Sequence, residues 1–175
     1  MIGLVVIGHA PFGAALFSCA RHVYGGDPER CVVVDVTADA EPSSELVRAS
    51  QAVAAVDQGE GVLVLVDMFG ATPGNIAAQL SQAGRVEVVA GVNVPMLMRV
   101  LCYRNTTTIA DLPEKALGGG ASGIMKIAST AVQHQRPLTG RPPPRDASSN
   151  GPCADPDALP DGAPNDGRAR LQDQQ

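Results

Sequence analysis

Short runs of apolar residues alternate along the first 128 positions with longer segments in which apolar residues recur every three or four positions. The runs are rich in β-branched residues, and three of the four lack clear polar alternation. This pattern is typical of strands buried on both faces of a parallel sheet. The predicted strands cover residues 2–7, 31–36, 61–66 and 86–90.

The intervening segments carry helical patterns. Pro42 fits a first helical turn, and apolar residues follow it at helix spacing. Thr72 is predicted to cap a helix that Pro73 begins. Further helices are predicted at 12–24, 95–103 and 112–117, and the glycines at 118–120 are expected to end the last one. Residues 124–128 alternate and predict a short edge strand.

Strands and helices that alternate in this way predict an α/β fold. We expect a doubly wound, four-stranded parallel sheet with right-handed crossovers and helices on both faces. The character of the chain changes near residue 135, beyond which lie eight of its fourteen prolines and no aromatic residue. We therefore predict one domain at 1–134 and a disordered tail at 135–175.

Composition narrows the classes of partner. The chain is 45% hydrophobic but only 3% aromatic, so aliphatic residues must build its core. A formal net charge of -5 without a cluster of Lys and Arg argues against nucleic acid as a partner. No apolar run approaches the roughly 20 residues of a transmembrane helix, and no basic segment precedes the first apolar run. We expect a cytoplasmic protein.

Two stretches are candidates for chemistry, because ligands of open α/β sheets bind beyond the carboxyl ends of the strands. G-H-A-P-F-G follows the first strand, and V-D-M-F-G-A-T-P-G-N ends the third. If these strands are neighbours, His9 and Asp67 emerge side by side. The carboxylate would then hold one imidazole nitrogen and leave the other free to act as a nucleophile. Helices beginning near Pro11 and at Thr72 would attract an anion, which favours a phosphoryl group carried on His9.

Other chemistries fit less well. Gly8 and Gly13 have the spacing of a nucleotide-binding loop, but Ala14 and Ala15 follow where Lys and Ser or Thr are required. One histidine and one aspartate are too few ligands for zinc, so we expect no metal and no cofactor. Two structural alternatives stay open, in which His9 is only a turn residue and Asp67 only a helix cap. A non-catalytic flavodoxin-like module that binds a small anion or a partner protein also stays open.

Three segments together resemble the IIA domain of the mannose family of the sugar phosphotransferase system (PTS). They are V-V-I-G-H-A-P-F-G at 5–13, G-V-L-V-L-V-D-M-F-G-A-T-P-G-N-I-A at 61–77 and V-V-A-G-V-N-V-P-M-L at 88–97. The resemblance runs from residue 1 to about residue 129. It differs from the common family pattern beside the histidine, where Gly8 and Ala10 replace Thr and Gly.

The resemblance implies a phosphotransferase whose His9 receives a phosphoryl group from the phosphocarrier protein HPr and passes it to a separate IIB protein. It implies that Asp67 hydrogen-bonds His9, and that Phe69, Gly70 and Thr72 border the phosphoryl group. A regulator that acts through its phosphorylation state is a second possibility. For the fold, the resemblance implies the strand order 2-1-3-4 and a short antiparallel edge strand that is exchanged in a homodimer. It also implies contact with the membrane only through IIC and IID components.

Overall fold

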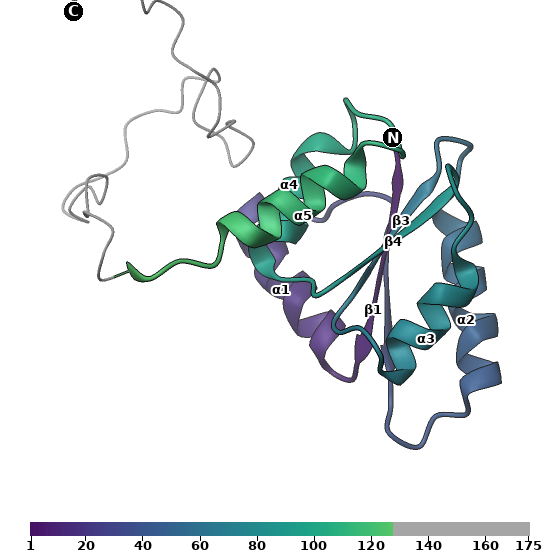
Figure 1. Cartoon of the computed structure of the whole chain (residues 1–175). Helices are drawn as coiled ribbons and strands as arrows, with labels where there is room; N and C mark the ends of the chain where they lie inside the picture. Colours follow the sequence, from purple (N-terminus) through teal and green to yellow (C-terminus); the bar gives the residue numbers. More distant parts are fainter. Residues whose placement is uncertain (128–175) are drawn as a thin grey trace, which may run out of the picture.

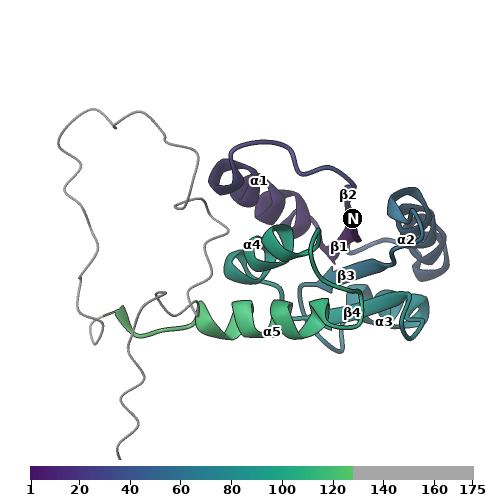
Figure 2. The ribbon, with the colours of Figure 1, turned by 90° about the horizontal axis from the view of Figure 1, so that it is seen from above.

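Four parallel strands form the centre of the molecule in the computed structural model, which describes residues 1–127. They are β1 (Gly3–His9), β2 (Cys31–Val36), β3 (Val62–Val66) and β4 (Val86–Ala90). Their order is β2-β1-β3-β4, so β1 is paired on both sides; Figure 1 gives the overall view and Figure 2 labels all four strands. The predicted strand order is confirmed.

Helices cover both faces of this sheet (Figures 1 and 2). One face carries α1 (Phe12–Tyr24), α4 (Val94–Tyr103) and α5 (Leu112–Ser122), and the other carries α2 (Pro42–Val56) and α3 (Thr72–Leu80). Successive strand residues point to opposite faces, so Leu4 and Val6 join one core cluster while Val5 and Ile7 join the other. The α/β doubly wound architecture follows from these two clusters.

Helix α5 is longer than predicted, because it continues through the glycines at 118–120 to Ser122. The reason is close packing against α4. A Cβ atom on Gly119 would lie 2.5 Å from Cβ of Arg99, and one on Gly120 would lie 2.7 Å from Cε of Met96. Here the glycines allow two helices to approach, and tertiary packing overrides their low helix propensity.

The predicted edge strand at 124–128 is absent over its described part. Residues 124–127 form no strand, and residue 128 lies outside the described residues. Helix α5 runs away from the sheet at its end (Figure 2), so the segment that follows it is not carried to the edge of its own sheet. Three of its side chains are exposed, Ile124 by 78%, Met125 by 61% and Ile127 by 78%. The predicted domain boundary at 134 and the tail at 135–175 also lie outside the described residues.

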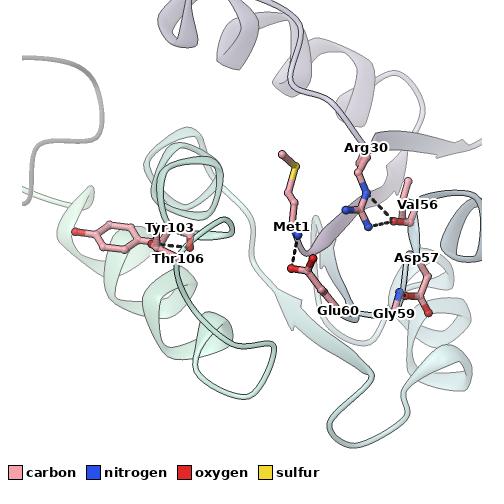
Figure 3. A network of polar contacts seen from close by, with 8 residues as sticks. All are labelled: Met1, Arg30, Val56, Asp57, Gly59, Glu60, Tyr103 and Thr106. Atoms are coloured by element: carbon pink, nitrogen blue, oxygen red, sulfur yellow. Dashed lines mark hydrogen bonds and ion pairs between the residues drawn. The ribbon is translucent and has the colours of Figure 1, made fainter. Parts of the chain in front are cut away.

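Polar contacts tie together the loops at the amino ends of the strands (Figure 3). The Arg30 side chain donates two hydrogen bonds to the backbone oxygen of Val56, at 3.2 and 2.8 Å, and so joins the start of β2 to the end of α2. The terminal amine of Met1 forms an ion pair with Glu60 just before β3. The opposite edge of the sheet, where the strands end, is the edge that carries the candidate chemistry.

No helix within residues 1–127 combines the length and the apolar character that crossing a membrane requires.

We predict that Leu65→Ala lowers the free energy of unfolding by about 2–5 kcal/mol, because Leu65 is fully buried in β3 and its truncation leaves a cavity. Urea denaturation measures this change. Val47→Ala is the control, since Val47 is 57% exposed on α2 and its truncation should change stability by about 0.5 kcal/mol at most. Equal losses in the two variants would contradict the assignment of the core.

Candidate functional site

The register of β1 and β3 brings His9 and Asp67 together. Ile7 pairs with Val66 in this parallel ladder, and the amide of Asp67 donates to the backbone oxygen of Ile7 at 3.3 Å. Strand β1 ends at His9, two residues after Ile7, and β3 ends at Val66 itself. The two chemical groups that the sequence places at separate strand ends are therefore neighbours.

The Asp67 carboxylate accepts three hydrogen bonds. Its Oδ2 atom accepts from the backbone N–H of His9 at 2.8 Å and lies 2.6 Å from Nδ1 of the His9 ring. Its Oδ1 atom accepts from the backbone N–H of Met68 at 2.7 Å. The Asp67 side chain is only 11% exposed, whereas that of His9 is 48% exposed. The carboxylate thus holds both the backbone and the ring of a histidine that faces solvent.

These bonds decide the protonation of the pair. Burial of the Asp67 carboxyl opposes ionisation, but the bonds from His9 and Met68 outweigh this effect and keep its pKa below the ordinary value of 3.8. An ionised carboxylate can only accept hydrogen bonds, so Nδ1 of His9 must carry the proton between them. In the neutral ring, Nε2 then keeps its lone pair and is the nucleophilic atom.

The segment from Met68 to Ala71 forms a projecting loop beside this pair. Gly70 adopts a φ of +81°, which favours glycine, and it lets the chain turn into α3. Gly74 lies under the loop, where a Cβ atom would come within 2.8 Å of the backbone oxygen of Met68. The turn leaves Phe69 90% exposed and Met68 53% exposed. Two apolar side chains are therefore exposed on the loop that follows Asp67, and of these the sequence analysis identified only Phe69.

Helix α3 begins at Thr72, one of the two residues, Thr72 and Pro73, at which its start was expected. Ala71 is its N-cap, Thr72 is its first residue, and no side chain caps it. The predictions that Thr72 caps this helix and, alternatively, that Asp67 does so were both wrong. Thr72 is exposed, and its hydroxyl is not used in capping. The positive end of α3 is thus uncapped by any described side chain, and it lies at the same edge of the sheet as His9.

Helix α1 differs, because a carboxylate of the protein already occupies its amino end. Asp35, next to last in β2, accepts from the backbone N–H of Gly13 through Oδ1 at 2.8 Å and from that of Ala14 through Oδ2 at 3.1 Å. We expected this helix end to attract an anion, but two of its first-turn amides, those of Gly13 and Ala14, already donate to Asp35. The visible clue was a lone aspartate in an otherwise apolar strand.

Gly8 packs beneath the His9–Asp67 pair. A Cβ atom at this position would lie 3.1 Å from Cδ1 of Phe12 and 3.4 Å from Oδ2 of Asp67. A larger residue here would require the Phe12 ring to move. The residue before His9 is therefore matched to the aromatic ring that begins α1.

The alternative in which His9 is a simple turn residue does not fit this geometry, because its ring bonds a carboxylate rather than the nearby backbone. Within residues 1–127, no group of three or more His, Cys, Asp or Glu side chains is arranged to hold a metal ion. The site has the parts needed to carry a small anionic group on an imidazole.

Comparison with known proteins identifies the family. A family model described as the fructose IIA component of the PTS (EIIA-man) matches residues 3–117. The chain belongs to this family of PTS IIA components. At this level its role is that of a phosphocarrier in a sugar phosphotransferase system, which confirms the resemblance noted in the sequence.

Individual relatives agree with the family assignment. This IIA component is 31% identical over 113 residues to the fructose-specific EIIA component of Bacillus subtilis, a match that covers 64% of this chain and 77% of that protein. It is 28% identical over 145 residues to the mannose-specific EIIAB component of Escherichia coli, covering 82% of this chain and 45% of the relative. The chain thus spans less than half the length of that two-part relative.

Solved structures share the fold of this IIA component. The EIIA structure from Streptococcus agalactiae superposes with a TM-score of 0.67 at 24% identity, over 74% of this chain and all of that one. A mannose/sorbose-specific IIA subunit from Enterococcus faecalis superposes with a TM-score of 0.59 at 20% identity, over 72% of this chain and 94% of that one.

We predict that Asp67→Asn destabilises the IIA component most strongly near neutral pH. The native pKa of Asp67 lies below its unfolded value, so the charged carboxylate contributes stability above about pH 3.8, and this contribution is lost as the pH falls through the lower native value. Urea denaturation of the wild type and the variant, at about pH 7 and at progressively lower pH, measures the difference. If the difference in unfolding free energy between the wild type and Asp67→Asn stayed the same in acid, the charge of Asp67 would contribute nothing to stability.

Proposed function

We propose that His9 is the phosphoryl acceptor of this IIA component, with HPr as the donor and a IIB protein as the acceptor of the next transfer. The observation that carries the proposal is the bond between Nδ1 of His9 and Oδ2 of Asp67, because it directs the free Nε2 atom away from the carboxylate. The ring's exposure supports access by a second protein.

The transfer balances without any further reactant. Nε2 of His9 attacks the phosphorus of phospho-HPr, a new N–P bond forms, and the bond to the HPr imidazole breaks with its electron pair returning to that imidazole. The Nδ1 proton of His9 stays in the bond to Asp67, whose negative charge stabilises the positive charge that develops on the ring. Transfer to IIB repeats the step with the roles exchanged.

The residues of the loop after Asp67 and of the start of α3 have different proposed roles in the transfer. The uncapped amino end of α3 and the hydroxyl of Thr72 are suited to binding phosphoryl oxygens. Gly70 shapes the loop that leads into this helix, and Phe69 provides an apolar contact for the incoming protein. We propose no such role for the end of α1, where the carboxylate of Asp35 already accepts from the amides of Gly13 and Ala14.

We predict that the protein becomes labelled when incubated with radioactive phosphoenolpyruvate, enzyme I and HPr, and that His9→Ala abolishes the label. His22→Ala is the matched control, since this exposed histidine lies near the far end of α1. Thr72→Ala should slow labelling roughly tenfold or more, by removing one hydrogen bond to a charged group. Thr106→Ala, at the opposite end of the sheet (Figure 3), should not slow it.

Label that persists in His9→Ala would refute the assignment of the acceptor. A wild-type protein that binds phosphate reversibly and never becomes covalently labelled would instead favour a non-catalytic binding module.

We also propose a homodimer in which the segment at 124–127 pairs with β4 of a second copy. Strand β4 lies at the edge of the described sheet, and its first residue, Val86, is bridged to Gln82. The residues that follow Val86 have no strand partner on that side within residues 1–127, and such edges accept an added strand. The exposed side chains of Ile124, Met125 and Ile127 supply apolar area for this contact.

We predict that sedimentation analysis gives the mass of a dimer, and that the double variant Ile124→Asp/Ile127→Asp gives a monomer because charges replace two apolar contacts. Val47→Asp is the control for a charge placed on an exposed apolar position of α2, and it should stay dimeric. A double variant that sedimented as a dimer would place the interface elsewhere.

A further inference from the structure

Asp35 is an acidic residue inside an otherwise apolar strand. It lies in β2 beside Gly8 in the ladder with β1, while its neighbour Val36 lies beside His9. The backbone of Asp35 therefore lies beside the end of β1, one residue before the position opposite His9. Its carboxylate is directed to α1, which follows His9 in the chain.

The contact of Asp35 with α1 involves both carboxylate oxygens and two consecutive amides, those of Gly13 and Ala14. It also depends on the absence of a side chain at Gly13. A Cβ atom there would lie 2.6 Å from Oδ1 of Asp35 and 2.8 Å from Cγ1 of Val33. The first turn of α1 is thus seated directly on β2.

The turn that presents His9 is held at both of its ends. At its start, the amide of Ala10 donates to the backbone oxygen of Val36 at 2.9 Å. At its end, Asp35 holds Gly13 and Ala14. Only three residues separate His9 from Gly13, so a shift of the first turn of α1 must be taken up by the backbone beside the histidine.

We infer that Asp35 is a positioning residue for the His9 imidazole, acting through the first turn of α1 and the short turn that joins it to β1. It also neutralises the positive end of α1, which leaves the end of α3 as the favoured place for an anion at this edge. The effect on transfer rests on the proposed function of His9, but the effect on the ring does not. An ordinary helix cap would stabilise α1 without affecting the state of His9.

The experiment compares Asp35→Ala and Asp35→Asn with Glu41→Ala. Glu41 is a matched control, because its carboxylate caps α2 by accepting from the amide of Ser44, and α2 lies on the other face of the sheet. Nitrogen-15 NMR of the unphosphorylated full chain measures the fraction of His9 rings with the proton on Nδ1. Labelling through HPr measures the rate of transfer, and urea denaturation confirms that each variant folds.

We expect Asp35→Ala to lower the Nδ1–H fraction of His9 and to slow labelling roughly tenfold or more, because a misplaced reacting group is costly. In Asp35→Asn, the Nδ1–H fraction and the labelling rate should lie between those of Asp35→Ala and the wild type, since the amide oxygen can still accept from one N–H. Glu41→Ala should lower the urea midpoint of unfolding, while the Nδ1–H fraction of His9 and the labelling rate stay as in the wild type.

A wild-type His9 spectrum and labelling rate in Asp35→Ala would overturn the inference and make Asp35 an ordinary cap. If Asp35→Ala does not fold, Asp35→Asn decides the question in the same way, because it has lost one of the two bonds. If the wild type is never labelled, the proposed function fails. The NMR comparison then still tests Asp35, since it needs no phosphoryl transfer.

Discussion

The Asp67 carboxylate accepts bonds from the backbone of β1, from the His9 ring and from the loop that follows β3, and these three contacts meet where the two central strands end. Parallel pairing makes this possible, because it brings the carboxyl ends of strands that are distant in sequence to one edge of the sheet. A change of one residue in the register of β1 and β3 would move the carboxylate away from the ring. The chemistry of the site therefore depends on the apolar packing that sets this register.

The two helices that begin at this edge are not equivalent. Helix α1 is capped by a carboxylate of the protein itself, and α3 has no side-chain cap. An incoming anion meets a neutralised helix end on one side of the sheet and a positive one on the other. The sequence alone suggested two equal anion-attracting ends. The difference arises from Asp35, whose contact with Gly13 joins two elements that local patterns treat as independent.

The sequence predicted those parts of the fold that depend on local patterns and burial. The four strands and the start of each helix were found within one or two residues, because apolar runs and proline positions report directly on them. The misplaced end of α5 has a tertiary cause, because Gly119 and Gly120 stay helical where α5 packs closely on α4. Residues 124–127 form no strand in a single described chain, so the exchanged edge strand stays a prediction. The pairing of His9 with Asp67 was predictable only on the assumption that β1 and β3 are neighbours.

The exposed ring of Phe69 has a consequence for the lifetime of complexes. Burying one aromatic side chain contributes about 1.5–3 kcal/mol, which is a factor of roughly ten to a hundred in affinity. Under the proposed function, one protein loads the carrier and another unloads it, so each must be released quickly and tight binding of either would limit turnover. A single exposed aromatic side chain, on the loop that Gly70 turns, would add only this limited affinity for each partner that contacts it.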